Sequence, residues 1–153
     1  MTELEPLFPA EKTQFALLCL ANYAEVQNSL LYMTGGGWNE YRRPAANEQG
    51  QRPMVRLGVA LIIQVPWSET NREQKFRIVI TDLDGKLAHL IKIEGGLSAG
   101  RPGMMPAGTI QYINMAFNVE VNFPQAGSYM LRGLINEDPA SAKSWEFRVI
   151  DPA

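Results

Sequence analysis

The sequence predicts an all-β protein, an antiparallel β-sandwich of seven to eight strands. In two long segments, residues 113–123 and 55–65, apolar residues occupy every second position. Side chains alternate between the two faces of a strand, so this period indicates long strands with one buried face. Turn residues separate the alternating segments at short intervals, and no helix-length pattern lies between them. We therefore expect Ile113–Asn122 and Val55–Val65 to be core strands.

A second strand is expected after the turn Pro124–Gly127, with Tyr129 near its start and Leu131 on the same face. Pro and Gly supply the backbone angles of such a turn. Residues 126–131 resemble the tyrosine corner of immunoglobulin-like sandwiches, in which the Tyr hydroxyl bonds to upstream backbone. This resemblance implies immunoglobulin-like architecture. Leu131 stands where an immunoglobulin domain has its second Cys, so no disulfide is implied.

We divide the chain into an N-terminal arm, residues 1–14, and one sandwich domain, residues 15–150. Residues 15–20 are apolar at both parities, which is typical of a buried helix or of a strand buried on two sides. Because Asn28-Ser29 is a turn signal and three glycines follow at 35–37, we expect a hairpin. A helix over 16–26 is the alternative.

Later segments add further strands. Residues 76–81 alternate, Asp84-Gly85 marks a hairpin turn, and residues 86–94 are the expected return strand. Residues 95–108 are rich in Gly and Pro and predict a long loop. The last strand is expected to place Trp145, Phe147 and Val149 inward.

Residues 21–38, which end in Gly-Gly-Gly-Trp, are similar to the opening of a family of small bacterial β-sandwich proteins of unknown function. Residues 65–67, 76–85 and the strand after Pro124 resemble that family too. The resemblance implies a single cytoplasmic β domain and brings no activity with it. The family usually has Gly-Lys where this chain has Ser29-Leu30, a departure that affects the first hairpin's turn.

Composition excludes several protein classes. A net charge of −2, with Arg42-Arg43 as the only adjacent basic pair in what we take to be a solvated turn, argues against nucleic-acid binding. No apolar run is long enough for a membrane helix. The N-terminus lacks the features of a signal peptide, so we expect a cytoplasmic protein without membrane contact. Cys19 is the single cysteine and is expected to be an inert core thiol.

The sequence offers little for catalysis or for a metal or cofactor. His89, the single histidine, shares parity with Leu87 and Ile91 and is expected to be a partly buried strand residue, not a catalytic base. Asp82 and Asp84 lack the further oxygen ligands that calcium needs. We therefore predict no catalytic, cofactor or metal residues, and the sequence favours a protein that is not an enzyme.

The best binding candidates are in loops, where function on a rigid sandwich usually resides. Aromatic, Arg and Met residues are enriched in interface cores. Our interpretation is a non-catalytic binding or assembly module with a protein partner. The alternative is a small-ligand or carbohydrate-binding sandwich that uses the loop tryptophans, and a small hydrolase comes third. The candidate residues are Trp38, Trp67, Arg101, Met104 and Met105.

Self-association is also expected, as a two-fold homodimer. Two of the expected strands are apolar on both faces. We assign four residues to the second face of these strands, namely Leu18, Leu20, Ala60 and Ile62. Such a surface must be covered by the other sheet, by the arm at Leu7-Phe8, or by another subunit, because monomers rarely expose large apolar patches.

Overall fold

The computed structural model describes residues 12–87 and 89–153, so the predicted N-terminal arm lies outside the described residues except for positions 12–14. The described chain forms ten strands and one short 3-10 helix, Trp67–Glu69. None of its helices is long and apolar enough to span a bilayer. The strands are β1 Gln14–Ala21, β2 Tyr23–Gln27, β3 Leu30–Thr34, β4 Glu40–Arg42, β5 Val55–Val65, β6 Gln74–Asp82, β7 Ile91–Leu97, β8 Gln111–Val121, β9 Gly127–Ile135 and β10 Asp138–Ile150.

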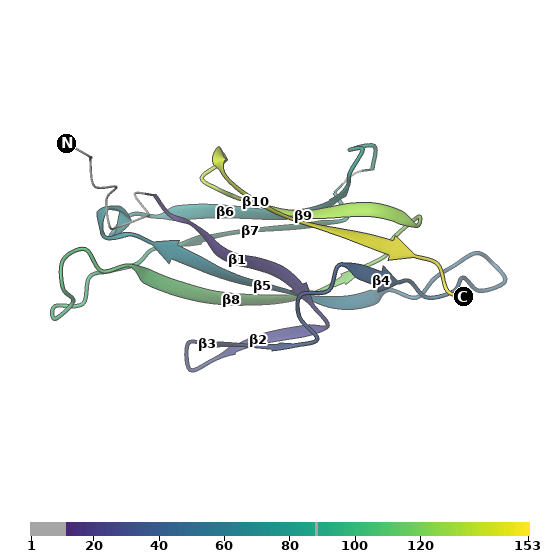
Figure 1. Cartoon of the computed structure of the whole chain (residues 1–153), viewed down its shortest axis with the longest axis horizontal. Helices are drawn as coiled ribbons and strands as arrows, with labels where there is room; N and C mark the ends of the chain where they lie inside the picture. The colour runs from purple at the N-terminus through teal and green to yellow at the C-terminus, as the bar shows by residue number, and fades with distance from the viewer. Residues whose placement is uncertain (1–11, 88) are drawn as a thin grey trace, which may run out of the picture.

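The structure confirms the predicted antiparallel β-sandwich. One layer is the five-stranded sheet β4-β10-β9-β6-β7, and the other is the three-stranded sheet β1-β5-β8. The hairpin β2-β3 forms a third, smaller layer on the outer side of the three-stranded sheet (Figure 1). All pairs are antiparallel except β10 with β4. The strand number exceeds the predicted seven to eight.

The core lies between the two main sheets and comes from one parity of each strand. β5 and β8 pair in register over all eleven residues of each, as expected for the two core strands. Tyr129 and Leu131 of β9 face the same core from the other sheet. The inward residues of β5 are all buried, namely Val55, Leu57, Val59, Leu61, Ile63 and Val65.

A bulge in β1 explains why residues 15–20 are apolar at both parities. Phe15 pairs with Ile63 and Leu17 with Ile62, so Ala16 is the extra residue, and it is exposed. A bulge shifts the parity of the residues after it. Leu18 and Leu20 therefore face the main core, and our assignment of them to the outer face is wrong.

The outer face of the three-stranded sheet is covered by the chain's own hairpin, which is none of the three coverings predicted from the sequence. Cys19, Ala24 and Ala60 form a small second core there, with Leu31 of β3 packed on it. Cys19 is buried as predicted, its Sγ lies 3.6 Å from Met33 Sδ, and burial raises the pKa of its thiol.

Asn118 of β8 holds the hairpin in place. Its side-chain Oδ1 accepts the Ala24 N–H (3.2 Å) and its Nδ2 donates to the Ala24 carbonyl (2.8 Å). Asn114 Nδ2 donates to the Ser29 carbonyl at the hairpin turn (2.8 Å). The approach is close because Gly58 has no side chain: a Cβ there would lie 2.9 Å from the Ala24 nitrogen.

Aromatic side chains fill the end of the sandwich where β8 and β10 finish. Phe123, Tyr129 and Phe147 contact one another with centroids 5.1 to 5.9 Å apart. The Tyr129 hydroxyl donates to the Gln125 carbonyl at 2.6 Å, which confirms the tyrosine corner.

Arg43 is buried at this end of the sandwich, against our expectation of a solvated turn, because it binds Asp151 and the Phe123 carbonyl.

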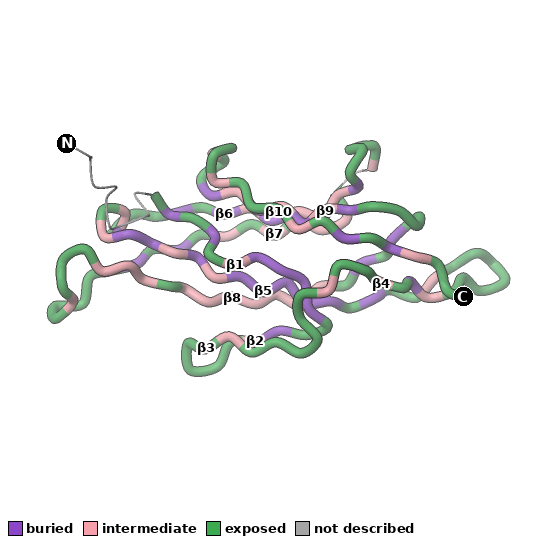
Figure 2. Tube along the Cα trace, viewed as in Figure 1, coloured by how far each residue is buried: buried purple, intermediate pink, exposed green. Residues whose placement is uncertain are grey.

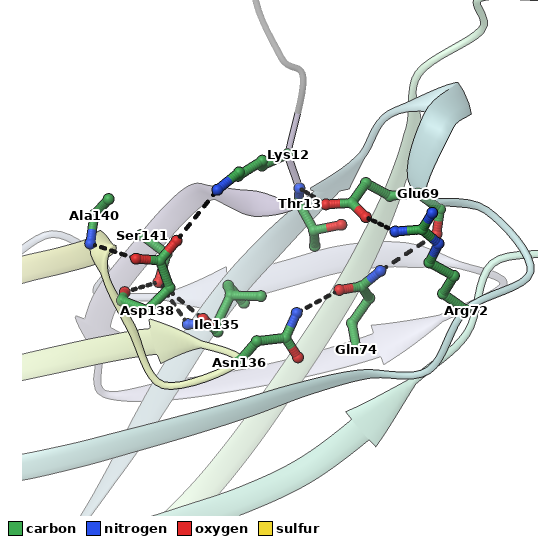
Figure 3. A network of polar contacts seen from close by, with 10 residues as sticks. All are labelled: Lys12, Thr13, Glu69, Arg72, Gln74, Ile135, Asn136, Asp138, Ala140 and Ser141. Atoms are coloured by element: carbon green, nitrogen blue, oxygen red, sulfur yellow. Dashed lines mark hydrogen bonds and ion pairs between the residues drawn. The ribbon is translucent and has the colours of Figure 1, made fainter.

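A polar network closes the opposite end (Figure 3). Gln74 is buried, accepts from Asn136 Nδ2 and donates to the Glu69 carbonyl. Glu69 accepts the Thr13 N–H at the start of β1. These hydrogen bonds join the start of β1, the β5–β6 connection and the β9–β10 connection, which are distant in sequence.

The connection between β6 and β7 is longer than predicted. Asp82 accepts the amides of Lys86 and Leu87, so the chain makes a wide turn and β7 begins only at Ile91. The predicted return strand over 86–94 is therefore misplaced. His89 is exposed in this connection, and its assignment as a partly buried strand residue is wrong.

We expect Gly58→Ala to lower the free energy of unfolding by about 1–3 kcal/mol, since the added methyl forces the hairpin away from the sheet. For a chain of this size that corresponds to a loss of several degrees in melting temperature, about 2–4 °C per kcal/mol. Thermal and urea unfolding measure it. Gly103→Ala is the matched control, because a Cβ there meets nothing within 4 Å. Equal effects of the two changes on stability would contradict a close contact between the hairpin and Gly58.

Tyr129→Phe removes the hydroxyl of the tyrosine corner and leaves the Gln125 carbonyl without this donor. The expected loss is about 1–2 kcal/mol in urea unfolding. Tyr112→Phe, at an exposed position on β8, should be neutral. Stability unchanged in both variants would show that the corner contributes nothing to folding.

Candidate functional site

Trp38 and Trp67 lie at opposite ends of the sandwich. Trp67 follows the last residue of β5, whereas Trp38 packs with Tyr41 and Phe147 near the first. The eleven residues of β5 separate the two ends by on the order of 30 Å. A single small ligand does not contact both tryptophans.

Trp38 is packed into the aromatic end of the core. Its ring lies 5.4 Å from Tyr41 and 5.7 Å from Phe147, and its carbonyl accepts the indole N–H of Trp145 at 3.0 Å. An edge-to-face contact of this kind stabilises packing. Trp38 is half-buried, closes one end of the core and lines an open pocket together with Gly36 and Arg42.

Trp67 is held by Arg101, a residue from the loop between β7 and β8. The guanidinium carbon lies 4.0 Å from the Trp67 ring centroid, and Arg101 also donates to the Trp67 carbonyl (2.7 Å) and to the Thr70 hydroxyl. A cation over an indole face is attracted by the ring quadrupole. One face of Trp67 is therefore already occupied.

The loop anchored by Arg101 presents two methionines. Met105 is half-buried, and its amide donates to the Pro102 carbonyl at 2.9 Å, while Met104 is 95% exposed at the tip. Trp67, Arg101, Met104 and Met105 thus belong to one end of the molecule. Met104 is the member of this group whose side chain is fully available to a partner.

The hairpin β2-β3 has an apolar outer face that the sequence reasoning missed. Tyr23, Leu30 and Tyr32 keep 43%, 58% and 49% of their surface exposed. Pairing of Tyr23 with Thr34, Glu25 with Tyr32 and Gln27 with Leu30 puts these six residues on the face opposite Ala24. We call them the outer hairpin face. In Figure 2 the hairpin is largely exposed beneath the sandwich.

Glu25 lies in the middle of the outer hairpin face. Its carboxylate accepts from the Tyr23 hydroxyl (3.3 Å) and from Gln27 Nε2 (3.2 Å), and the described residues give it no ion pair. Two tyrosines, a leucine and an unneutralised carboxylate are therefore presented together. This face could have been found from the sequence. The turn at Asn28-Ser29 sets which residues of the two short strands pair, and side-chain alternation then places these residues on one side.

The Asp82 carboxylate serves the fold by accepting backbone amides. Burial raises the pKa of the Asp82 carboxyl, but the amides of Leu87 and Lys86 that bind it outweigh that effect and hold the pKa below its usual value. Within residues 12–87 and 89–153, no three potential metal ligands lie together. His89 lies in the same connection as Asp84 and is exposed.

The chain matches no protein-family model, and no curated protein is significantly similar to it.

Arg101→Ala should release the loop over 98–110, because the ring contact and both hydrogen bonds are lost together. We expect faster amide exchange in that loop by mass spectrometry, with a global stability change of about 1 kcal/mol or less. Arg72→Ala is the control at the same end, since Arg72 is exposed and, within the described residues, its ion pair is with Glu69. Unchanged exchange in Arg101→Ala would show that the loop is held by other contacts.

Proposed function

We propose that the protein is a non-catalytic binding or assembly module that acts in the cytoplasm through protein contacts. The supporting observation is the outer hairpin face, where Tyr23, Leu30 and Tyr32 are exposed together on a small sheet. Tyr is enriched at interface cores and gives large contact area at low entropic cost. A folded domain gains nothing in its own stability from exposing these side chains.

The way the hairpin is mounted supports this proposal. Ala24 and Leu31 point inward and are fixed through Asn118 and the small second core. The residues of the outer hairpin face are therefore held in a fixed orientation. Preorganisation reduces the entropy lost on binding. The hairpin thus presents this surface in a fixed orientation.

The chemistry of the face suggests the chemistry of the partner. Apolar rings flank the Glu25 carboxylate, which has no cation beside it among the described residues. A partner that places an Arg or Lys between apolar side chains would complement this arrangement. The contact should weaken with salt to the extent that the charge pair is solvent-exposed.

The carbohydrate-binding alternative gains no support from the geometry. It uses Trp38 and Trp67, which lie at opposite ends, and Arg101 already covers one face of Trp67.

The test compares variants of equal stability in affinity capture from the native host. The triple variant Tyr23→Ser, Leu30→Ser, Tyr32→Ser should lose the partners that the wild type retains. The matched control, Met54→Ser with Leu83→Ser, removes exposed apolar side chains elsewhere and should keep them. Identical captured proteins for both variants would reject the outer hairpin face as the binding surface.

A further inference from the structure

The edge of β8 is the long unprotected strand edge in the described part of the molecule. β8 is the last strand of its sheet, its eleven residues pair only with β5, and neither a bulge nor a proline interrupts them. Its single charged residue is Glu120. Edges of this length and composition invite pairing with another chain, which proteins usually prevent with Lys, Pro, bulges or short strands.

The other described edges of the two main sheets show those protections. β1 has its bulge and contacts β9 and β10 of the facing sheet. β4 is three residues long, and β7 presents Lys92 and Glu94. β10 pairs with β4 only over 148–150, and the remainder of its outer edge carries Pro139, Lys143 and a register shift. Among the described strands of the two main sheets, β8 is the long edge without such protection.

The core also lies open along this edge. Leu57, Val59 and Leu61 of β5 are buried, but the four inward residues of β8 beside them are only half-buried. On the facing sheet, Ile91 and Ile93 of the edge strand β7 are half-buried as well. Adding a strand beside β8 would remove this apolar surface from water. The half-buried residues of β8 are Ile113, Met115, Phe117 and Val119.

The sequence of β8 reads nearly the same in both directions about Ala116. The positions one, two and three residues away on each side match in kind: Met115 with Phe117, Asn114 with Asn118, and Ile113 with Val119. An antiparallel pair of two β8 strands centred on Ala116 therefore sets apolar inward residues against apolar ones and Asn against Asn. It also sets Tyr112 against Glu120, so no like charges meet.

This register is the one that pairs all eleven residues. Antiparallel registers that differ by one position place inward residues beside outward ones. A register that places Glu120 beside its own copy brings like charges together. The hairpin contacts to Asn114 and Asn118 come from outer-face side chains, so the backbone along the edge stays unpaired in the described chain.

We propose that β8 binds the β8 of a second copy of this chain about a two-fold axis at Ala116. The two three-stranded sheets then form one continuous six-stranded sheet. The self-complementary pattern of the strand selects a second copy over an unrelated donor strand. The surface is separate from the outer hairpin face, and either can function without the other.

Sedimentation equilibrium over a wide range of protein concentration tests the dimer. The wild type should reversibly form dimers. Tyr112→Glu places a carboxylate opposite Glu120 twice per dimer and should weaken the dimer about tenfold. Tyr112→Glu with Glu120→Lys restores opposite charges and should regain most of the affinity. Tyr112 is 60% exposed, so the monomer fold should be retained, which circular dichroism checks.

Disulfide trapping tests the register. Opposed residues in an antiparallel pair have Cα atoms about 4.5–5.5 Å apart, within the reach of a disulfide. A mixture of Tyr112→Cys chains with Glu120→Cys chains should cross-link, and neither chain should cross-link with itself, because identical positions lie on the order of 25 Å apart. Cys19 is buried and does not compete.

A wild type that is monomeric at all concentrations overturns the proposal, as does a dimer unaffected by Tyr112→Glu. Cross-linking of either cysteine chain with itself, at the expense of the mixed product, overturns the register. A partner strand from another protein on β8 would leave the purified chain monomeric and also counts against the second copy. None of these results bears on the capture experiment with the hairpin variants.

Discussion

The fold depends on the hairpin β2-β3 covering the apolar outer face of the three-stranded sheet. The three-stranded sheet carries Leu17, Cys19, Ala60 and Ile62 on the side away from the main core, and in water this surface would be costly. Asn118 resolves this by bonding the Ala24 backbone as a neighbouring strand would. Small residues make the contact close enough for those bonds. The hairpin is therefore part of the fold as well as the surface that we propose for binding.

Much of the sandwich was predictable because its strands follow a strict period of two. β5 and β8 were found nearly to the residue, and the tyrosine corner followed from the turn residues before Tyr129. The Asn28-Ser29 turn was also identified from its residue types, and both residues have positive φ. Local patterns sufficed wherever local geometry decided the outcome.

The errors came from features that have no local pattern. Nothing in residues 15–20 marks Ala16 as a bulge, so the faces of Leu18 and Leu20 were exchanged. Asp82 binds amides four and five residues ahead, which converts an expected tight turn into a wide one and exposes His89. The sequence could not show that the binding candidates divide between two ends of the sandwich, because the ends on which Trp38 and Trp67 lie are set by the pairing of distant strands.

The position of Cys19 beneath β3 makes its thiol a reporter of motion. The sulfur is buried beside Met33, and the raised pKa of the thiol keeps it protonated at neutral pH, so a reagent in solution finds no thiolate while the hairpin is seated. Reaction requires β2-β3 to lift from the sheet without global unfolding. The modification rate of a single native thiol thus measures how often the hairpin detaches from the sheet, without any label being introduced.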